Sequence, residues 1–306
     1  MSGIAFQSLP FGGDAARRLA SRLGLPCHEI SLHRFPDGEL RVTVGPAAPT
    51  TILHASLDQP NEKLIALLFA AEALRRNGAK RLVLVAPYLC YMRQDIAFHA
   101  GEAVSQRAIG RLLATIMDRI VTVDAHLHRT PDISAVFPGI EAENLSAMPA
   151  MATALAEAGV DPATMLIGPD AESEPWVSDL ASRLGLQHMV ARKTRRGDRS
   201  VDIAFTDRDR IAGRPALLVD DIVSSGGTLM VAARTLTALG ASRVDAVVTH
   251  ALFPPEMVKT FADAGIRSIR STDSVPHPTN AIALDAVLAA ALQRELTAPH
   301  PPETTT

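Results

Sequence analysis

Residues 216–229 limit the possible folds more than any other stretch of the chain. They begin with a short apolar run, Ala216 to Val219, which is typical of a strand buried on both faces of a sheet. Asp220 and Asp221 follow where that strand should end, and small residues then lead into a helical pattern. A strand, a turn of small residues and a helix form a cradle for an anion, because glycines let N–H groups approach the ligand and the helix N-terminus carries partial positive charge.

The adjacent carboxylates Asp220 and Asp221 narrow the kind of ligand that this cradle can hold. Carboxylates repel a phosphate, so they need another partner, and either sugar hydroxyls or a divalent cation suits them. The stretch is not a Walker A loop, since no Gly-Lys-Ser/Thr follows, and the plainer alternative is a turn with an Asx cap before a helix. It resembles the phosphoribosyl-diphosphate (PRPP) binding loop of type I phosphoribosyltransferases and PRPP synthetases. Its candidate anion-binding residues are Ser224, Ser225, Gly226, Gly227 and Thr228.

Length and composition describe a globular protein of about two domains. The chain has 306 residues, of which 47% are hydrophobic and 21% charged, and its net charge is −3. Such a charge gives no general affinity for nucleic acid, so any basic site must be local. Cys27 and Cys90 lie far apart without metal-binding spacing, which fits a reducing cytoplasm. We expect neither a signal peptide nor a membrane span.

Strand and helix patterns alternate along the chain, which predicts an α/β fold with largely parallel sheets. Residues 81–86 form a continuous apolar run, for example, and residues 62–76 carry apolar side chains at helical spacing. The alternation restarts near the middle of the chain. We therefore expect two domains, residues 1–146 and 147–296, followed by a disordered tail over 297–306.

Polar side chains directly follow several of the predicted apolar strands. In open parallel sheets ligands bind beyond the carboxyl ends of the strands, so these side chains can converge on one site. They are Arg93, Gln94, Asp124, His126, Asp170, Lys193, Arg195, Asp220 and Asp221.

Each of these residues also has a plainer interpretation when it is taken singly. Arg93 could form a surface ion pair, and His126 could be a core histidine with satisfied hydrogen bonds. Lys193 and Arg195 could belong to a solvated face, and Asp170 could cap the following helix. Their joint occurrence at strand ends favours a shared site.

The order and spacing of six segments resemble those of PRPP synthetases, also called ribose-phosphate diphosphokinases, over about residues 3–294. The first segment is the stretch around Asp220, which phosphoribosyltransferases share. The other segments are absent from those transferases, so the combination is more specific than the loop alone. They are residues 35–39, 87–95, 124–126, 169–170 and 193–195.

The resemblance implies two similar phosphoribosyltransferase-type domains, each with a mainly parallel sheet flanked by helices. It implies an active site between the domains and against a neighbouring subunit of a homo-oligomer. In that family the segment equivalent to Phe35, Asp37, Gly38 and Glu39 comes from the adjacent subunit and holds the adenine of ATP. A ring to stack on and acceptors for the exocyclic amine suit that role.

The resemblance also implies roles for the residues at the predicted strand ends. Arg93, Gln94 and His126 would contact ATP, and His126 and Asp170 would hold Mg²⁺ directly or through water. Lys193 would be the catalytic lysine on a mobile loop after its strand.

The remaining residues would then bind ribose 5-phosphate. Arg195 lies beside Lys193, and Asp220 and Asp221 would take the ribose hydroxyls. The turn from Ser224 to Thr228 would take the 5-phosphate.

The implied reaction is attack of the anomeric hydroxyl of ribose 5-phosphate on the β-phosphorus of ATP, which releases AMP and forms PRPP. Charge develops on phosphoryl oxygens, so cations and Mg²⁺ matter more than covalent catalysis. Ile96 to His99 after the Arg-Gln-Asp segment and Ser224 in the loop depart from the bacterial and animal pattern. Ser224 and the segment from Phe98 to Glu102 look more like archaeal members.

Two other functions stay open at this point. A phosphoribosyltransferase that consumes PRPP would explain the loop, but it would leave residues 35–39 and Arg93 without a role. A catalytically silent regulatory relative is disfavoured by the presence of Lys193, Arg195 and His126, because such relatives tend to lose the catalytic cations.

Overall fold

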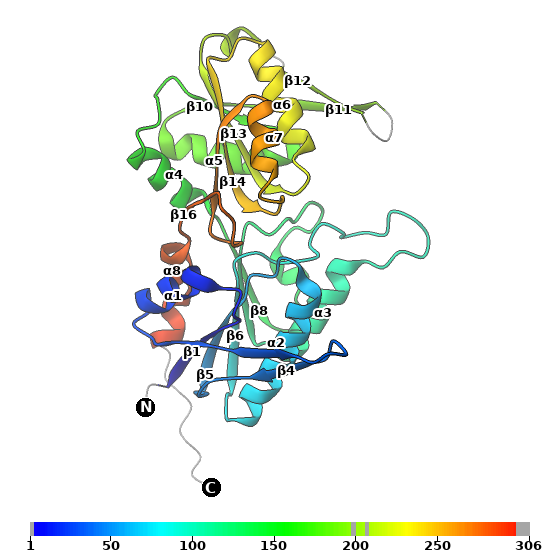
Figure 1. Ribbon diagram of the computed structural model, residues 1–306, viewed down its shortest axis with the longest axis vertical. Coiled ribbons are helices and arrows are strands. Elements are labelled where there is room, and N and C mark those ends of the chain that lie inside the picture. The colour runs from blue at the N-terminus through cyan, green and yellow to red at the C-terminus, as the bar shows by residue number, and fades with distance from the viewer. Residues whose placement is uncertain (1–2, 197–199, 206–207, 298–306) are drawn as a thin grey trace. The chain divides into compact units, whose positions relative to one another are not determined.

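The chain forms two compact units, which Figure 1 shows in a computed structural model that describes residues 3–196, 200–205 and 208–297. Unit 1 comprises Met1–Ser146 and Leu284–Thr306, and unit 2 comprises Ala147–Ala283. The tail predicted to be disordered lies outside the described residues except for Thr297.

Unit 1 is built on a six-stranded sheet in which all neighbouring strands are parallel. Its strand order, β2-β1-β5-β6-β7-β8, reverses direction between β1 and β5, which is the switch point of a doubly wound sheet. The strands are β1 (Ile4–Ser8), β2 (Cys27–Glu29), β5 (Thr50–His54), β6 (Arg81–Ala86), β7 (Arg119–Val123) and β8 (Glu141–Leu145).

Unit 2 repeats this architecture with a second six-stranded parallel sheet in the order β10-β9-β13-β14-β15-β16. The switch point here lies between β9 and β13. The predicted α/β class with two parallel-sheet domains is therefore confirmed. The strands are β9 (Met165–Gly168), β10 (Gln187–Val190), β13 (Pro215–Val223), β14 (Arg243–Ala251), β15 (Ile266–Thr272) and β16 (Asn280–Ile282).

Helices cover both faces of each sheet, as Figure 1 shows. In unit 1, α1 packs with α8 on one face and α2 with α3 on the other; in unit 2, α4 packs with α5, and α6 and α7 lie on the opposite face. The helices are α1 (Gly13–Arg22), α2 (Pro60–Arg76), α3 (Ser105–Ile116), α4 (Met148–Glu157), α5 (Glu174–Leu184), α6 (Gly227–Ala238), α7 (Met257–Asp263) and α8 (Asp285–Thr297).

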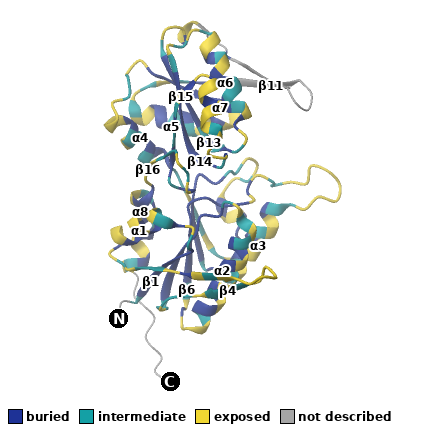
Figure 2. Cartoon of the chain, in the orientation of Figure 1, coloured by how far each residue is buried: buried dark blue, intermediate teal, exposed yellow. Residues whose placement is uncertain are grey.

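Two antiparallel ribbons and three short 3₁₀ helices complete the described structure. Figure 2 shows that the strands of the two main sheets are buried and that the β3–β4 ribbon is largely exposed. The ribbons are β3 (Ser31–Arg34) with β4 (Leu40–Thr43) and β11 (Arg192–Arg196) with β12 (Ser200–Ala204); the 3₁₀ helices are η1 (Ile133–Ala135), η2 (Ala171–Ser173) and η3 (Arg208–Arg210).

The sequence patterns predict most of these elements, and the exceptions have physical reasons. The apolar and polar residues from Cys27 to Leu32 predict one strand, but the chain divides at the buried Ile30 into β2 and β3, which belong to different sheets. The edge strands β8 and β16 are polar or short, so their sequences carry no clear alternation. Among the described residues, no helix has both the length and the hydropathy that crossing a membrane requires.

Helix α8 belongs to unit 1, whereas the sequence predicts its segment in the C-terminal domain. The reason is a buried ionic cluster at the amino ends of the unit 1 strands. Glu295 accepts hydrogen bonds from Arg81 at 2.8 Å and from Arg119 at 2.9 Å. Arg119 is fully buried and also donates to Glu143 on β8 at 2.6 Å. Contacts so distant in sequence leave no local pattern.

Replacing Glu295 by alanine is expected to lower the free energy of unfolding by about 3–5 kcal/mol, because two guanidinium groups lose the carboxylate that they share. Burial raises the pKa of Glu295, but hydrogen bonds from Arg81 and Arg119 outweigh burial and bring the pKa below the ordinary glutamate value. The stabilisation is therefore present above the ordinary pKa and is lost as pH falls through the lowered one. Urea unfolding followed by circular dichroism at several pH values measures both effects.

Glu72→Ala provides the matched control for this experiment. Glu72 pairs with Arg76 on the surface of α2, where both side chains are more than half exposed. We expect the Glu72→Ala variant to unfold at almost the same urea midpoint as the wild type. Equal midpoints for the two variants would mean that the cluster does not anchor α8.

Candidate active site

The loop between β13 and α6 forms a cradle at the carboxyl end of the unit 2 sheet. Strand β13 continues through Asp220 and Asp221 to Val223, so the two acids lie within the last residues of the strand and not after it. Gly226 has φ of +68° and precedes the first residue of α6. The first N–H groups of a helix lack intrahelical acceptors, so this helix start is suited to bind an anion.

The backbone at Gly226 has no room for a side chain. A Cβ atom built there would lie 2.2 Å from Cε1 of Phe261, whose ring is fully buried and packs edge-on against Phe253. At Gly227 the nearest atom to a built Cβ atom is 3.9 Å away. The two glycines therefore serve different purposes, because the first is required by packing and the second keeps the loop surface open.

Three carboxylates converge beside this loop at the switch point between β9 and β13. Asp170 lies just beyond β9, and Asp220 and Asp221 lie at the end of β13. The pKa of Asp220 is raised well above the ordinary aspartate value by burial and then by the negative charges of Asp221 and Asp170. A cluster of carboxylates of this kind is suited to receive hydroxyl donors or a cation.

Asp170 also has the structural role that its sequence position allows. Its carboxylate accepts a hydrogen bond from the backbone N–H of Glu172 at 3.1 Å, which caps η2 directly before α5. Asp170 therefore caps a helix, as its plainer interpretation predicts, and also belongs to the acidic cluster.

Lys193 and Arg195 lie in strand β11 and not on a loop after a strand. The sequence predicts one strand over 188–192, but β10 ends at Val190 and a separate ribbon begins at Arg192. Ala191 donates its N–H to the carbonyl of Gly168 at 2.9 Å, so the base of the ribbon lies at the carboxyl end of β9. In the ribbon Lys193 pairs with Ile203, and Arg195 pairs with Val201. The side chains at 193 and 195 lie outside the described part of the structure.

Phe35, Asp37, Gly38 and Glu39 form the exposed tip of the β3–β4 ribbon. The N–H of Phe35 donates to the carbonyl of Glu39 at 2.8 Å, and Asp37 accepts from the N–H of Glu39 at 3.1 Å, which closes the predicted turn. Phe35 is 38% exposed and makes an edge contact with His33. Figure 1 shows this tip apart from the loop that follows β6, so unit 1 does not gather the two segments at one place.

Arg93 and Gln94 lie in the loop after β6, with Arg93 exposed. Ser105 donates to the amide oxygen of Gln94 at 2.7 Å, which fixes Gln94 at the start of α3. The adjacent Asp95 forms an ion pair with Arg129 at 2.9 Å. No sequence pattern singles out Arg129, because the pair joins loops that follow two different strands.

Asp124 and His126 follow β7, the strand next to β6. Asp124 is buried and has φ of +39°, which is unusual for a residue other than glycine and is typical of functional sites. The side chain of Asn144 on β8 accepts a hydrogen bond from the N–H of Ala125 at 2.8 Å and so positions this turn. His126 is partly buried and its ring stacks near that of His128.

The structure thus gathers the candidate residues into two groups, one in each unit. Unit 2 brings together Asp170, Asp220, Asp221, the residue 224–228 loop and the base of the β11–β12 ribbon. In unit 1, the loops after β6 and β7 carry Arg93, Gln94 and His126 at the carboxyl edge of the sheet. Within the described part of the chain, no group of three or more His, Cys, Asp or Glu side chains is arranged to hold a metal ion by itself.

Comparison with known proteins identifies related sequences over almost the whole chain. Residues 11–116 match the family model described as the N-terminal domain of ribose phosphate pyrophosphokinase, and residues 150–275 match the phosphoribosyl transferase domain. The ribose-phosphate pyrophosphokinase of Methanopyrus kandleri is 33% identical over 284 residues, which cover 92% of this chain and 96% of that protein. Ribose-phosphate pyrophosphokinase 2 of Archaeoglobus fulgidus is 35% identical over 260 residues, with coverage of 85% and 89%.

A solved structure shares the fold. The crystal structure of phosphoribosylpyrophosphate synthetase from Mycobacterium smegmatis aligns with a TM-score of 0.81 at 24% identity and covers 95% of this chain and 98% of that one. The two family models, the archaeal relatives and this fold agree with the resemblance found in the sequence. The chain belongs to the ribose-phosphate pyrophosphokinase family.

Proposed function

We propose that this chain is a ribose-phosphate diphosphokinase, which transfers the diphosphoryl group of ATP to the 1-hydroxyl of ribose 5-phosphate and yields PRPP and AMP. The observation that carries the proposal is the unit 2 cradle, in which an anion-binding helix start adjoins a pair of carboxylates. A sugar phosphate has one group for the helix start and another for the pair of carboxylates. Its phosphate suits the helix start, and its hydroxyls suit the acids.

Ribose 5-phosphate is assigned to unit 2. The loop from Ser224 to Thr228 would hold the 5-phosphate, and Asp220 and Asp221 would accept hydrogen bonds from the ribose hydroxyls. Arg195 and Lys193, which belong to the ribbon whose base adjoins this site, would follow the charge on the transferred group. Arginine can pair with a phosphoryl group through two parallel hydrogen bonds, whereas lysine acts as a point charge.

ATP is assigned to Arg93, Gln94 and His126 and to the residue 35–39 turn of a neighbouring subunit. The exposed Phe35 offers a ring face for adenine, and its position at a ribbon tip suits a contact outside its own unit. We therefore propose a homo-oligomer in which two subunits share each adenine site.

Magnesium is the cofactor that fits this donor set. Mg²⁺ is usually bound by one or two carboxylates, by water and by substrate phosphates, so a cage of three protein ligands is not required. Asp170 is one such carboxylate, and its negative charge, with burial and the charge of Asp221, raises the pKa of Asp220. His126 and Asp170 would hold the ion directly or through water. When bound, it would offset charge on the phosphoryl oxygens.

The reaction site would lie in a reducing cytoplasm. Cys27 and Cys90 are both free thiols, and Cys90 is buried. No step of the proposed reaction requires either thiol. A cytosolic enzyme commonly keeps its cysteines reduced.

Release of AMP from ATP is the direct test of the function. We expect AMP to form only when ribose 5-phosphate and Mg²⁺ are both present, in equal amounts with PRPP. A phosphoribosyltransferase would consume PRPP without forming AMP from ATP, and a silent relative would form neither product. Either result would contradict the proposal.

Replacing Asp220 by asparagine is expected to stabilise the ligand-free protein while weakening ribose 5-phosphate binding. Because the folded-state pKa of Asp220 is raised, its favourable contribution to stability is full below the ordinary aspartate pKa and is lost as pH rises through the raised value. The variant should therefore unfold at higher urea concentration than the wild type at neutral pH. Its affinity for ribose 5-phosphate should fall about tenfold or more, since a charged hydrogen-bond acceptor is removed.

Asp179→Asn is the matched control, because it removes a partly exposed carboxylate, which pairs with Arg183 on α5, from the same unit. Urea unfolding and calorimetric titration with ribose 5-phosphate give the two readouts. An Asp220→Asn protein that binds the sugar phosphate as tightly as the control would remove Asp220 from the site.

A further inference from the structure

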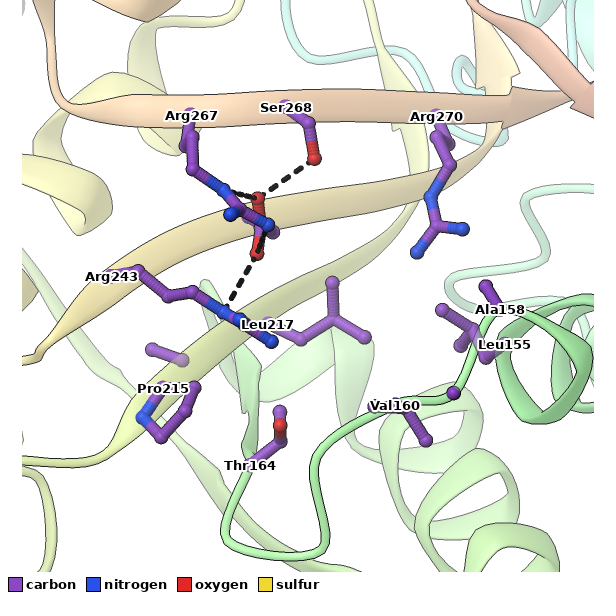
Figure 3. Close-up of a pocket in the computed structure, with 13 residues that line it drawn as sticks. Leu155, Ala158, Val160, Thr164, Pro215, Leu217, Arg243, Arg267, Ser268 and Arg270 are labelled. Atoms are coloured by element: carbon purple, nitrogen blue, oxygen red, sulfur yellow. Dashed lines mark hydrogen bonds and ion pairs between the residues drawn. The ribbon is translucent and has the colours of Figure 1, made fainter.

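Unit 2 contains a polar cavity at the opposite end of its sheet from the residue 224–228 loop. The cavity has a volume of about 380 Å³ and lies at the amino ends of the strands, where Pro215 opens β13 and Arg243 opens β14. Strand β13 separates it from the loop by roughly 25 Å, given about 3.3 Å per residue. Figure 3 shows the side chains that line it.

The cavity carries an excess of positive charge. Three arginines line it, Arg243, Arg267 and Arg270, and Asp245 is the only acid among the residues that line it. Arg267 donates to both oxygens of Asp245, at 3.1 and 3.2 Å, and Arg243 lies 3.3 Å from the same carboxylate. One carboxylate therefore faces two guanidinium groups, as the dashed lines in Figure 3 show, and Arg270 adds a further positive charge.

A shift in strand register concentrates these groups. Val244 pairs with Ile266, but Asp245 pairs with Ser268, so Arg267 is the extra residue of a bulge between β14 and β15. As a result Ser268 also donates to Asp245, at 2.7 Å, and the carboxylate is occupied on both oxygens. Asp245 fixes the wall of the cavity and has little capacity left to neutralise Arg270.

Several donors around the cavity have unused capacity. The hydroxyl of Thr164 is buried and has no hydrogen-bond partner in the described part of the chain. No contact within the described residues pairs the guanidinium of Arg270. Buried donors without acceptors are costly, so their presence in one cavity indicates a missing acceptor.

The helix end at this cavity does not oppose an anion. Helix α4 finishes here, and a helix C-terminus carries partial negative charge on its last carbonyls. Three of its last four carbonyls accept hydrogen bonds, because Ala158 N–H donates to Ala154, Val160 N–H to Leu155 and Gly159 N–H to Ala156. The apolar side chains of Leu155, Val160 and Leu217 form the neutral part of the wall.

We propose that this cavity binds a small anion that carries a phosphoryl group, held between Arg243 and Arg270, with Thr164 as a further donor. Guanidinium groups bind phosphoryl oxygens with paired hydrogen bonds, which makes arginine better suited than lysine to such a site. The volume exceeds that of a phosphate ion, so the apolar wall can also accommodate an organic group attached to it. The site does not depend on the proposed activity of the chain.

Methyl NMR of the full-length chain tests the site with two probes, inorganic phosphate and phenyl phosphate, at constant ionic strength. Leu155, Val160 and Leu217 report on the cavity, and Leu229 in the first turn of α6 reports on the loop site. We expect saturable shifts of the cavity methyl groups with at least one probe. Tighter binding of phenyl phosphate would identify a phosphorylated organic molecule as the ligand class, and equal binding would identify inorganic phosphate.

Three variants make the result specific. Arg270→Gln should weaken binding at the cavity about tenfold or more, with the loop reporter unchanged, because a charge-assisted hydrogen bond is lost. Thr164→Val should weaken it a few-fold and should not impair folding, since it removes an unpaired buried hydroxyl at nearly constant volume. Arg234→Gln, an equal charge change on the exposed surface of α6, should have no effect. The proposal would be overturned if the cavity methyl groups did not shift with either probe. It would also be overturned if Arg270→Gln left their shifts unaltered.

Discussion

Replacing Lys193 by alanine is expected to lower kcat for PRPP formation by about 10²- to 10³-fold while leaving the affinity for ATP nearly unchanged. Phosphoryl transfer builds charge on oxygens that are less charged in the ground state, so a cation placed there acts mainly on the transition state. A loss confined to kcat is the kinetic sign of such an interaction. Steady-state kinetics with a separate measurement of nucleotide binding provide the test.

The backbone of the ribbon supplies the control for that experiment. Residues two apart in a strand share a face, so positions 193 and 195 of β11 lie on one face and position 196 lies on the other. Arg196→Ala removes a positive charge from the same ribbon and should leave kcat within a few-fold of the wild type. Equal losses for Lys193→Ala and Arg196→Ala would point to general electrostatics of the ribbon, and an unchanged kcat for Lys193→Ala would exclude Lys193 as the catalytic cation.

Local sequence patterns predict the parts of the fold that depend on neighbouring residues. Strands β6, β7 and β9 begin and end where their apolar runs do, because each is buried on both faces and so contains few polar residues. The stretch from Ala216 to Thr228 behaves in the same way, since the strand, the positive φ of Gly226 and the start of α6 are all local. The strand, loop and helix start of this stretch could therefore be predicted from the sequence, and its role as a ribose 5-phosphate site stays a prediction.

Features that depend on distant residues could not be predicted. Helix α8 looks like any short amphipathic helix, and it joins unit 1 because Glu295 meets Arg81 and Arg119 there. The polar strand β8 forms at the sheet edge, where its Asn144 positions Ala125. The cationic cavity is similarly hidden, because its arginines belong to two strands whose register shift is not visible in the sequence.

The division of β10 from β11 is an intermediate case. The sequence predicts a strand over 188–192, and nothing in the order of these residues marks the point where the chain leaves the main sheet after Val190. The break follows from pairing, since Ala191 closes onto Gly168 and the next residues pair with β12. The sequence predicts that Lys193 follows the strand directly, and it could not predict the ribbon that carries this residue.

Replacing Gly226 by alanine is expected to lower the free energy of unfolding of unit 2 by about 2–5 kcal/mol. A side chain at a left-handed position costs roughly 1–2 kcal/mol, and forcing a methyl group into a packed core adds about 1–3 kcal/mol. Here the methyl carbon would lie 2.2 Å from the ring of Phe261, which is fully buried against Phe253 and has little freedom to move. Trp176 on α5 is the only tryptophan of the chain, so its fluorescence during urea unfolding reports on this unit.

Gly227→Ala separates packing from ligand binding at the adjacent position. A Cβ atom at residue 227 meets nothing closer than 3.9 Å and its backbone is not left-handed, so the Trp176 transition should stay at the wild-type urea concentration. The same methyl group would occupy the surface where backbone N–H groups approach the 5-phosphate, so affinity for ribose 5-phosphate should fall about tenfold or more. Calorimetric titration measures that affinity. If Gly227→Ala bound ribose 5-phosphate as tightly as the wild type, the helix start would not be the phosphate site. The two glycines would then differ only in packing, and the stability of Gly226→Ala would not change this conclusion.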